Sequence, residues 1–174
     1  ADRTDRMTVA PAESRIRSAT PADTALILAL IRELAEYEKL ANEAVADEAG
    51  LAVQLFGPTP RAEVLIAEIG GTPAGFALFF HNFAAFVGKP GLYLEDLFVR
   101  PAFRGHGLGK RLMVRLAQIA VERDCGRFEW SVLDWHAPAI EFYRGLGAVG
   151  MDDWTVQRVS GDALRALATQ SHKD

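Results

Sequence analysis

Five segments of the chain repeat apolar residues at the three- and four-residue spacing of an amphipathic helix. Several of them carry a signal for a helix end. Thr20-Pro21 places a hydroxyl and a proline at a helix start, and Gly57-Pro58 stops a helix. The pattern predicts helices over residues 20–40, 48–56, 108–125, 139–146 and 161–168.

Shorter apolar runs without helical spacing predict strands. They are rich in β-branched and aromatic residues. Gly70-Gly71 joins two of these runs in a tight hairpin, and Gly75 indicates a β-bulge in the second. A helix separates the fourth and fifth runs, so these two strands should be parallel. The predicted strands cover residues 15–19, 63–69, 73–81, 92–99, 128–133 and 151–159.

The order of these elements predicts an α+β fold with a mixed, mostly antiparallel sheet and flanking helices. With 174 residues, 49% of them hydrophobic, the chain is long enough for one core and short for two domains. We expect a disordered tail over residues 1–14 and a single domain over residues 15–174.

Charge and cysteine content limit the classes of ligand and partner that the chain can bind. A formal net charge of −4, with no basic stripe, argues against nucleic acid as the main partner and weakly suits a cationic substrate. The one cysteine, Cys125, excludes an internal disulfide and a cysteine-based metal cluster. No apolar run reaches about eighteen residues and no signal-peptide core is evident, so we expect a cytoplasmic protein without a membrane partner.

Two acids, Glu95 and Asp96, interrupt the apolar run at 92–99. Consecutive strand residues point to opposite faces, so at least one acid should point into the protein unless a bulge re-aims it. An unpaired buried carboxylate is costly, which favours a functional acid or base. The alternative is a pair of acids satisfied by a backbone or arginine partner.

A glycine-rich turn, Arg104-Gly105-His106-Gly107-Leu108-Gly109, leads from that strand into the next helix. Glycines let a ligand approach the backbone, and the first N–H groups of a helix, with its dipole, attract anions. Arg104, Lys110 and Arg111 add positive charge. The spacing fits neither a P-loop nor the dinucleotide fingerprint, and a plain glycine turn is the alternative.

The pattern Arg-x-x-Gly-x-Gly, after a strand and opening a helix, resembles the acetyl-CoA pyrophosphate loop of the GNAT acetyltransferases. Further motifs resemble the diamine (spermidine/spermine) acetyltransferase branch of that superfamily, including its thialysine-acetylating members. The resemblance runs from about residue 16 to residue 154. Its other motifs are residues 32–40, Tyr93-Leu94-Glu95-Asp96, Val132-Leu133-Asp134-Trp135 and Phe142-Tyr143-Arg144-x-x-Gly147-Ala148. By themselves, residues 32–40 are typical of a solvated helix end.

The resemblance implies the GNAT fold, in which two parallel strands splay apart, with acetyl-CoA as co-substrate, no metal and a homodimer. It implies that Tyr143 protonates the departing thiolate and that Glu95 binds the amine or takes its proton through water. The implied cofactor-binding residues are Leu97, Phe98, Val99, Arg104, Gly105, His106, Gly107, Leu108, Gly109, Lys110, His136 and Ala139. The implied amine pocket comprises Tyr37, Glu38, Asp96, Trp130 and Asp152.

Two departures from the branch bear on the substrate. His136 stands where the family commonly has asparagine, and Phe83-Ala84-Ala85-Phe86 stands where polyamine-acetylating members carry an acid and a tryptophan. A long polycation would lose one anchor there. The expected activity is therefore acetyl transfer to the primary amine of a small diamine, polyamine or lysine-like amino acid, with the shorter amines favoured.

Other interpretations stay open. A protein or peptide amine is an alternative acceptor, and a non-catalytic acyl-CoA-binding sensing module is an alternative function. Tyr143 alone is also compatible with a core aromatic of an amphipathic helix.

Overall fold

The computed structural model describes residues 13–170 and forms two compact units, one ending at Ser131 and the other beginning at Val132. Most of the expected N-terminal tail lies outside the described residues. Ser14, which we placed in that tail, is instead the first residue of a strand. The expectation of a single domain over residues 15–174 stays a prediction.

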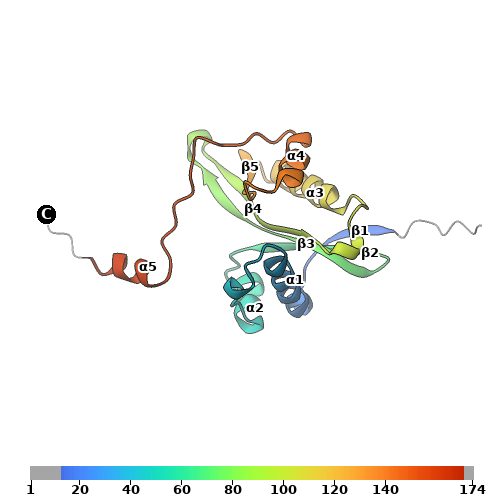
Figure 1. The fold of residues 1–174 in the computed structure, drawn as a ribbon, viewed down its shortest axis with the longest axis horizontal. Coiled ribbons are helices and arrows are strands. Elements are labelled where there is room, and N and C mark those ends of the chain that lie inside the picture. Colours follow the sequence, from blue (N-terminus) through green and yellow to red (C-terminus); the bar gives the residue numbers. More distant parts are fainter. Residues whose placement is uncertain (1–12, 171–174) are drawn as a thin grey trace, which may run out of the picture. The chain divides into compact units, whose positions relative to one another are not determined.

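The first unit is built on a five-stranded sheet (Figure 1). The strands are β1 (Ser14–Ser18), β2 (Glu63–Ile69), β3 (Thr72–Ala84), β4 (Lys89–Val99) and β5 (Arg127–Trp130), and they lie in this order across the sheet. The first four strands pair antiparallel, whereas β5 runs parallel to β4. The expected mixed sheet and its parallel pair are confirmed.

Helices α1 and α2 cover one face of this sheet and α3 lies on the other (Figure 1). On the first face, Ile27, Leu30 and Leu55 of the helices pack with Ile66 and Phe76 of the sheet. Burying side chains of this size contributes about 1.5–3 kcal/mol each. The helices are α1 (Thr24–Tyr37), α2 (Glu48–Phe56), α3 (Leu108–Glu122), α4 (Ala137–Gly145) and α5 (Gly161–Ala168), with short 3-10 turns η1 (Pro21–Asp23), η2 (Ala41–Glu43), η3 (Ala85–Val87) and η4 (Pro101–Phe103).

The expected bulge at Gly75 is present. The register between β2 and β3 shifts there, because Ala67 pairs with Gly75 and Glu68 pairs with Pro73. A Cβ at Gly75 would overlap the carbonyl oxygen of Phe98 on the neighbouring strand. Only glycine lets the two backbones come this close.

The strand predicted over residues 151–159 is wrong. The structure has no strand in that segment, and every residue from 149 to 170 is exposed. Trp154 keeps 80% of its surface accessible. Alternating apolar residues form a strand only where a neighbouring strand takes their backbone hydrogen bonds, and the described part of the second unit contains no strand.

Several element ends also differ from the prediction, among them the ends of α1, α3 and β5. Helix α1 ends at Tyr37 rather than residue 40, because Lys39 adopts a left-handed backbone with φ of 61°. Helix α3 ends at Glu122, and Asp124 takes the left-handed conformation after it with φ of 55°. Strand β5 ends at Trp130, three residues earlier than expected. In both helices, a left-handed residue ends the helical hydrogen bonds earlier than the spacing of apolar residues had predicted.

Candidate functional site

A β-bulge at Glu95 decides where the two acids of β4 point. Asp96 pairs with Leu78 of β3, and Leu94 pairs with Phe79, so Glu95 is an extra residue without a partner on β3. The extra residue shifts the alternation and places Asp96 on the face where Leu78 packs against α1 and α2. Glu95 is exposed and Asp96 is half-buried. The expectation that at least one acid points into the protein is confirmed for Asp96.

Asp96 lies in a strongly perturbed environment. Burial, together with the negative charges of Glu95 and Glu38, raises the pKa of Asp96 to about 6. Three carboxylates from β4 and the end of α1 therefore act on one another. A cation bound among them would relieve this repulsion, so the cluster suits an ammonium group.

The two parallel strands separate directly beside these acids. Strand β5 pairs with β4 only from Gly91 to Leu94, and residues 95–99 of β4 have no strand partner on that side within the first unit's described residues. Trp130, the last residue of β5, lies opposite Leu94 in the register. The edge at Leu97 to Val99 thus offers backbone N–H and C=O groups to an extended ligand.

The glycine turn after β4 leaves an open surface at the start of α3. Gly105 and Gly107 adopt left-handed backbones with φ of 82° and 74°, and Gly107 is the N-cap of α3. A Cβ at Gly105, Gly107 or Gly109 would meet no atom within 4 Å. The first N–H groups of a helix have no acceptor within it, so this surface can bind an anion such as a phosphate.

Two arginines fasten this turn to helix α1. Arg100 forms a bidentate ion pair with Glu33, with both N···O distances 2.9 Å, and also donates to the Pro73 carbonyl at 3.1 Å. The guanidinium of Arg104 lies 4.6 Å from the ring centre of Tyr37. Sequence reasoning missed both contacts. The equal four-residue spacing of the two arginines and of their two partners on α1 was the only local signal.

The remaining predicted site residues, His136, Ala139, Tyr143 and Asp152, belong to the second unit. His136 is the N-cap of α4, where its Nδ1 accepts a hydrogen bond from the Ala139 backbone N–H at 3.1 Å. An imidazole can therefore cap this helix. Tyr143 is half-buried on α4, with its ring 5.3 Å from that of Phe142. Asp152 is exposed.

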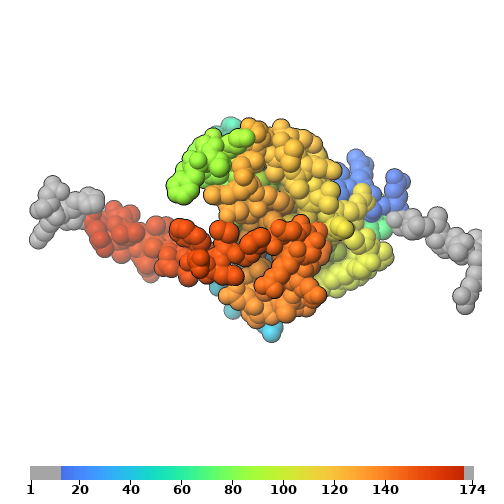
Figure 2. All heavy atoms as spheres, turned by 90° about the horizontal axis from the view of Figure 1, so that it is seen from above, coloured from blue at the N-terminus to red at the C-terminus, as the bar shows by residue number. Residues whose placement is uncertain are grey.

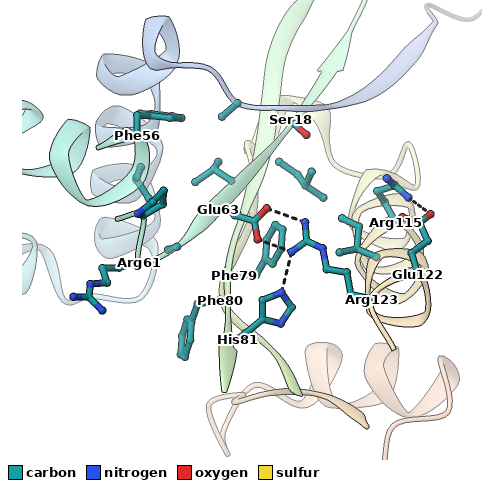
Figure 3. Close-up of a pocket in the computed structure, with 17 residues that line it drawn as sticks. Ser18, Phe56, Arg61, Glu63, Phe79, Phe80, His81, Arg115, Glu122 and Arg123 are labelled. Carbon is teal, nitrogen blue, oxygen red and sulfur yellow. Dashed lines mark hydrogen bonds and ion pairs between the residues drawn. The ribbon is translucent and has the colours of Figure 1, made fainter. Parts of the chain in front are cut away.

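The first unit also contains a cavity of about 680 Å³ that none of the predicted site residues lines (Figure 3). It lies where β2 extends past the end of β1. Arg123 at the end of α3 donates to both carboxylate oxygens of Glu63 at 2.6 and 2.9 Å, and these hydrogen bonds, with its charge, lower the pKa of Glu63. Arg123 also lies 2.9 Å from Nε2 of His81. These polar groups hydrogen-bond to one another. The cavity is distinct from the site at β4, because no residue of that site lines it.

Among the described residues, no group of three or more histidine, cysteine, aspartate or glutamate side chains could hold a metal ion. No helix between residues 13 and 170 is both long and apolar enough to span a bilayer.

Comparison with known proteins extends these observations. A sequence model of the acetyltransferase (GNAT) family matches residues 27–148. The thialysine N-epsilon-acetyltransferase of Bos taurus is 37% identical over 164 residues, which cover 88% of this chain and 96% of that protein. The L-ornithine N5-acetyltransferase NATA1 of Arabidopsis thaliana is 35% identical over 199 residues, covering 88% and 87%.

A solved structure shares the fold. The integron cassette protein VCH_CASS6 from the mobile metagenome of V. cholerae superposes with a TM-score of 0.77 and 28% identity, and the match covers 90% of this chain and 98% of that one. Both the family match and the shared fold agree with the expectation from the glycine turn and its flanking elements.

Proposed function

The chain belongs to the acetyltransferase (GNAT) family of N-acetyltransferases, and from this membership we propose that it transfers the acetyl group of acetyl-CoA to the primary amine of a small diamine, polyamine or lysine-like amino acid. The observation that carries the substrate class is the cluster of Glu38, Glu95 and Asp96, where burial and the charges of the other two acids raise the pKa of Asp96. Relatives named for thialysine and ornithine acetylation support a short amine.

The cofactor proposal rests on the fit of the chain around β4 and α3. Acetyl-CoA supplies an activated acetyl group as a thioester. The open backbone edge at Leu97, Phe98 and Val99 would pair with its extended arm. Its pyrophosphate would lie on the turn from Arg104 to Lys110, where the open glycine surface and the helix start favour an anion. His136 and Ala139 remain proposed contacts.

The amine must lose a proton before it reacts. A free alkylamine, with a pKa of about 10.4, is neutral in only about one molecule in a few thousand at pH 7. Glu95 is exposed at the bulge, where water can reach it, and we assign it the role of taking the ammonium proton through water. The neutral nitrogen would then form the N–C bond while the C–S bond breaks. Tyr143 would give its phenolic proton to the sulfur, and the second proton that the nitrogen loses on becoming an amide would return to Tyr143 through water.

The end of the β3–β4 hairpin favours short amines. It carries Phe83 and Phe86, which are 62% and fully exposed, and no acid lies between them. This end projects from the first unit (Figure 2). Because it offers a polycation no carboxylate there, a diamine or a lysine-like amino acid is favoured over spermine. Tyr37, Glu38, Asp96, Trp130 and Asp152 complete the proposed pocket, and the homodimer and cytoplasmic location stay predictions.

The test is the release of coenzyme A from acetyl-CoA with putrescine, spermidine, lysine, ornithine, thialysine and a lysine-containing peptide. The proposal expects turnover on at least one short amine, with kcat/KM at least tenfold above that for the peptide. Turnover on the peptide alone would establish protein acetylation instead. Tight acetyl-CoA binding without turnover on any amine would favour the non-catalytic sensing module.

A further inference from the structure

Arg104 connects the glycine turn to the end of α1. Its Nε–H donates to the Val99 carbonyl at 3.0 Å. Its guanidinium carbon lies 4.6 Å from the ring centre of Tyr37 and 5.8 Å from that of Phe98. Both distances are within the range of about 6 Å in which a cation is attracted to an aromatic face. Arg104 thus touches the proposed cofactor edge and the proposed amine pocket at the same time.

The neighbouring contact of Arg100 explains why Arg104 can leave its position without moving the turn. Glu33 and Tyr37 lie one turn apart on α1, so they present their side chains on the same face. Arg100 binds Glu33 through two hydrogen bonds, and its side chain is 26% exposed. Arg104 is exposed and keeps one hydrogen bond. The contact between Arg100 and Glu33 therefore holds the turn on α1, while Arg104 can leave Tyr37 for another partner.

The ring of Tyr37 is a place where two cations would compete. An aromatic face attracts an ammonium group as it attracts a guanidinium, and one face cannot take both at this distance. If Tyr37 lines the amine pocket, as the proposed function holds, Arg104 lies over one face of a ring that would also attract the substrate's cationic group.

We propose that Arg104 is a built-in competitor for the amine at Tyr37, and that phosphate binding at the start of α3 removes it from the ring. This inference rests on the proposed function. Charge-assisted hydrogen bonds to phosphate are stronger than an exposed cation–π contact, so Arg104 exchanges Tyr37 for the phosphates when they bind. The amine pocket then opens only beside a bound cofactor.

Reciprocity makes this coupling measurable without any amine. Both the amine and coenzyme A must break the contact between Arg104 and Tyr37 in order to bind. The contact therefore weakens coenzyme A binding by the same factor by which it weakens amine binding. An exposed cation–π contact corresponds to a factor of about two to five. Removing the ring should therefore tighten coenzyme A binding, which loss of a merely structural side chain would not do.

The experiment measures coenzyme A affinity by calorimetry at low salt. Tyr37→Leu should bind about two to five times more tightly than wild type, whereas Tyr37→Phe, which keeps the ring face, should match wild type. Arg104→Gln should bind more weakly, and Tyr37→Leu added to it should change nothing more. Lys110→Ala is the matched control, since it removes a nearby cation and leaves the contact with Tyr37. In that background Tyr37→Leu should still tighten binding.

A second measurement uses thialysine. Coenzyme A should tighten thialysine binding about two- to fivefold in wild type and leave it unchanged in Arg104→Gln. Unaltered or weaker coenzyme A binding by Tyr37→Leu, with its thermal melt unchanged, would overturn the competition. A wild-type protein that binds no coenzyme A would instead overturn the proposed function, so the two failures are distinguishable.

Discussion

Asp96 lies directly across the sheet from Leu78, on the face that packs against α1 and α2. Without the extra residue at Glu95, Asp96 would share the opposite face with Leu94, among side chains that are almost fully buried. One inserted residue therefore moves a carboxylate to the end of α1, beside Glu38. The resulting cluster has consequences for stability and for catalysis.

The raised pKa of Asp96 predicts a pH-dependent stability. The folded protein holds this proton up to about pH 6, whereas the unfolded chain releases it near pH 3.8. The stabilising contribution is therefore fully present below pH 3.8 and is lost as the pH rises through 6. It amounts to about 2–3 kcal/mol from the size of the shift.

Asp96→Asn should accordingly raise the free energy of unfolding at pH 7 by about 1–2 kcal/mol and flatten its pH dependence between pH 4 and 6. Urea unfolding from pH 4 to pH 7 measures both the free energy of unfolding at pH 7 and its pH dependence. Asp153→Asn, at an exposed position of the second unit, should alter neither. A less stable Asp96→Asn protein at pH 7 would show that the carboxylate is satisfied rather than strained.

Glu95→Gln should lower kcat by about 10²-fold if Glu95 takes the ammonium proton through water. Coenzyme A affinity should stay unchanged, because Glu95 projects from the bulge rather than from the glycine turn. Steady-state kinetics with thialysine and calorimetry with coenzyme A separate the two effects. Glu48→Gln, at an exposed acid of α2, serves as the control. Equal kcat values for both variants would remove Glu95 from the reaction.

Tyr143→Phe should also lower kcat by about 10²-fold with little change in coenzyme A affinity, because it deletes only the phenolic proton donor. The alternative, a packing role in α4, would make the adjacent ring matter equally. Phe142→Leu should therefore keep its kcat while losing some stability. If Tyr143→Phe turns over as fast as wild type, the assignment of the acid fails.

Gly107→Ala and Gly109→Ala should separate backbone strain from ligand access. Gly107 has φ of 74°, so alanine there costs about 1 kcal/mol of stability, whereas Gly109 lies within α3 and alanine should stabilise the helix by about 0.5–1 kcal/mol. Neither Cβ meets another atom. Both variants should nevertheless weaken coenzyme A binding, because each Cβ occupies the open surface. Undiminished binding by Gly109→Ala would place the phosphates elsewhere.

The sequence predicted most accurately those helices and strands whose ends carry a capping or terminating residue. The bounds of α2, α5 and β2 match the sequence prediction because proline, glycine or an N-cap residue marks their ends. The glycine turn was likewise readable, since the left-handed backbones of Gly105 and Gly107 are ones that glycine adopts without strain. Gly75 marked its bulge for a different reason, because a Cβ there would overlap the Phe98 carbonyl oxygen.

By itself, the sequence determined the order of the elements, the glycine turn at the start of α3 and the presence of two acids on β4. Tertiary structure decided which face Asp96 takes, because a bulge at Glu95 depends on the register with β3. It also decided that Arg100 and Arg104 reach Glu33 and Tyr37, which lie 67 residues earlier in the chain. Such contacts follow from packing between distant segments, and the matching four-residue spacing within each pair does not by itself show that the two pairs meet. The segment 151–159 shows the same limit, since a strand depends on a neighbour that its own pattern cannot supply.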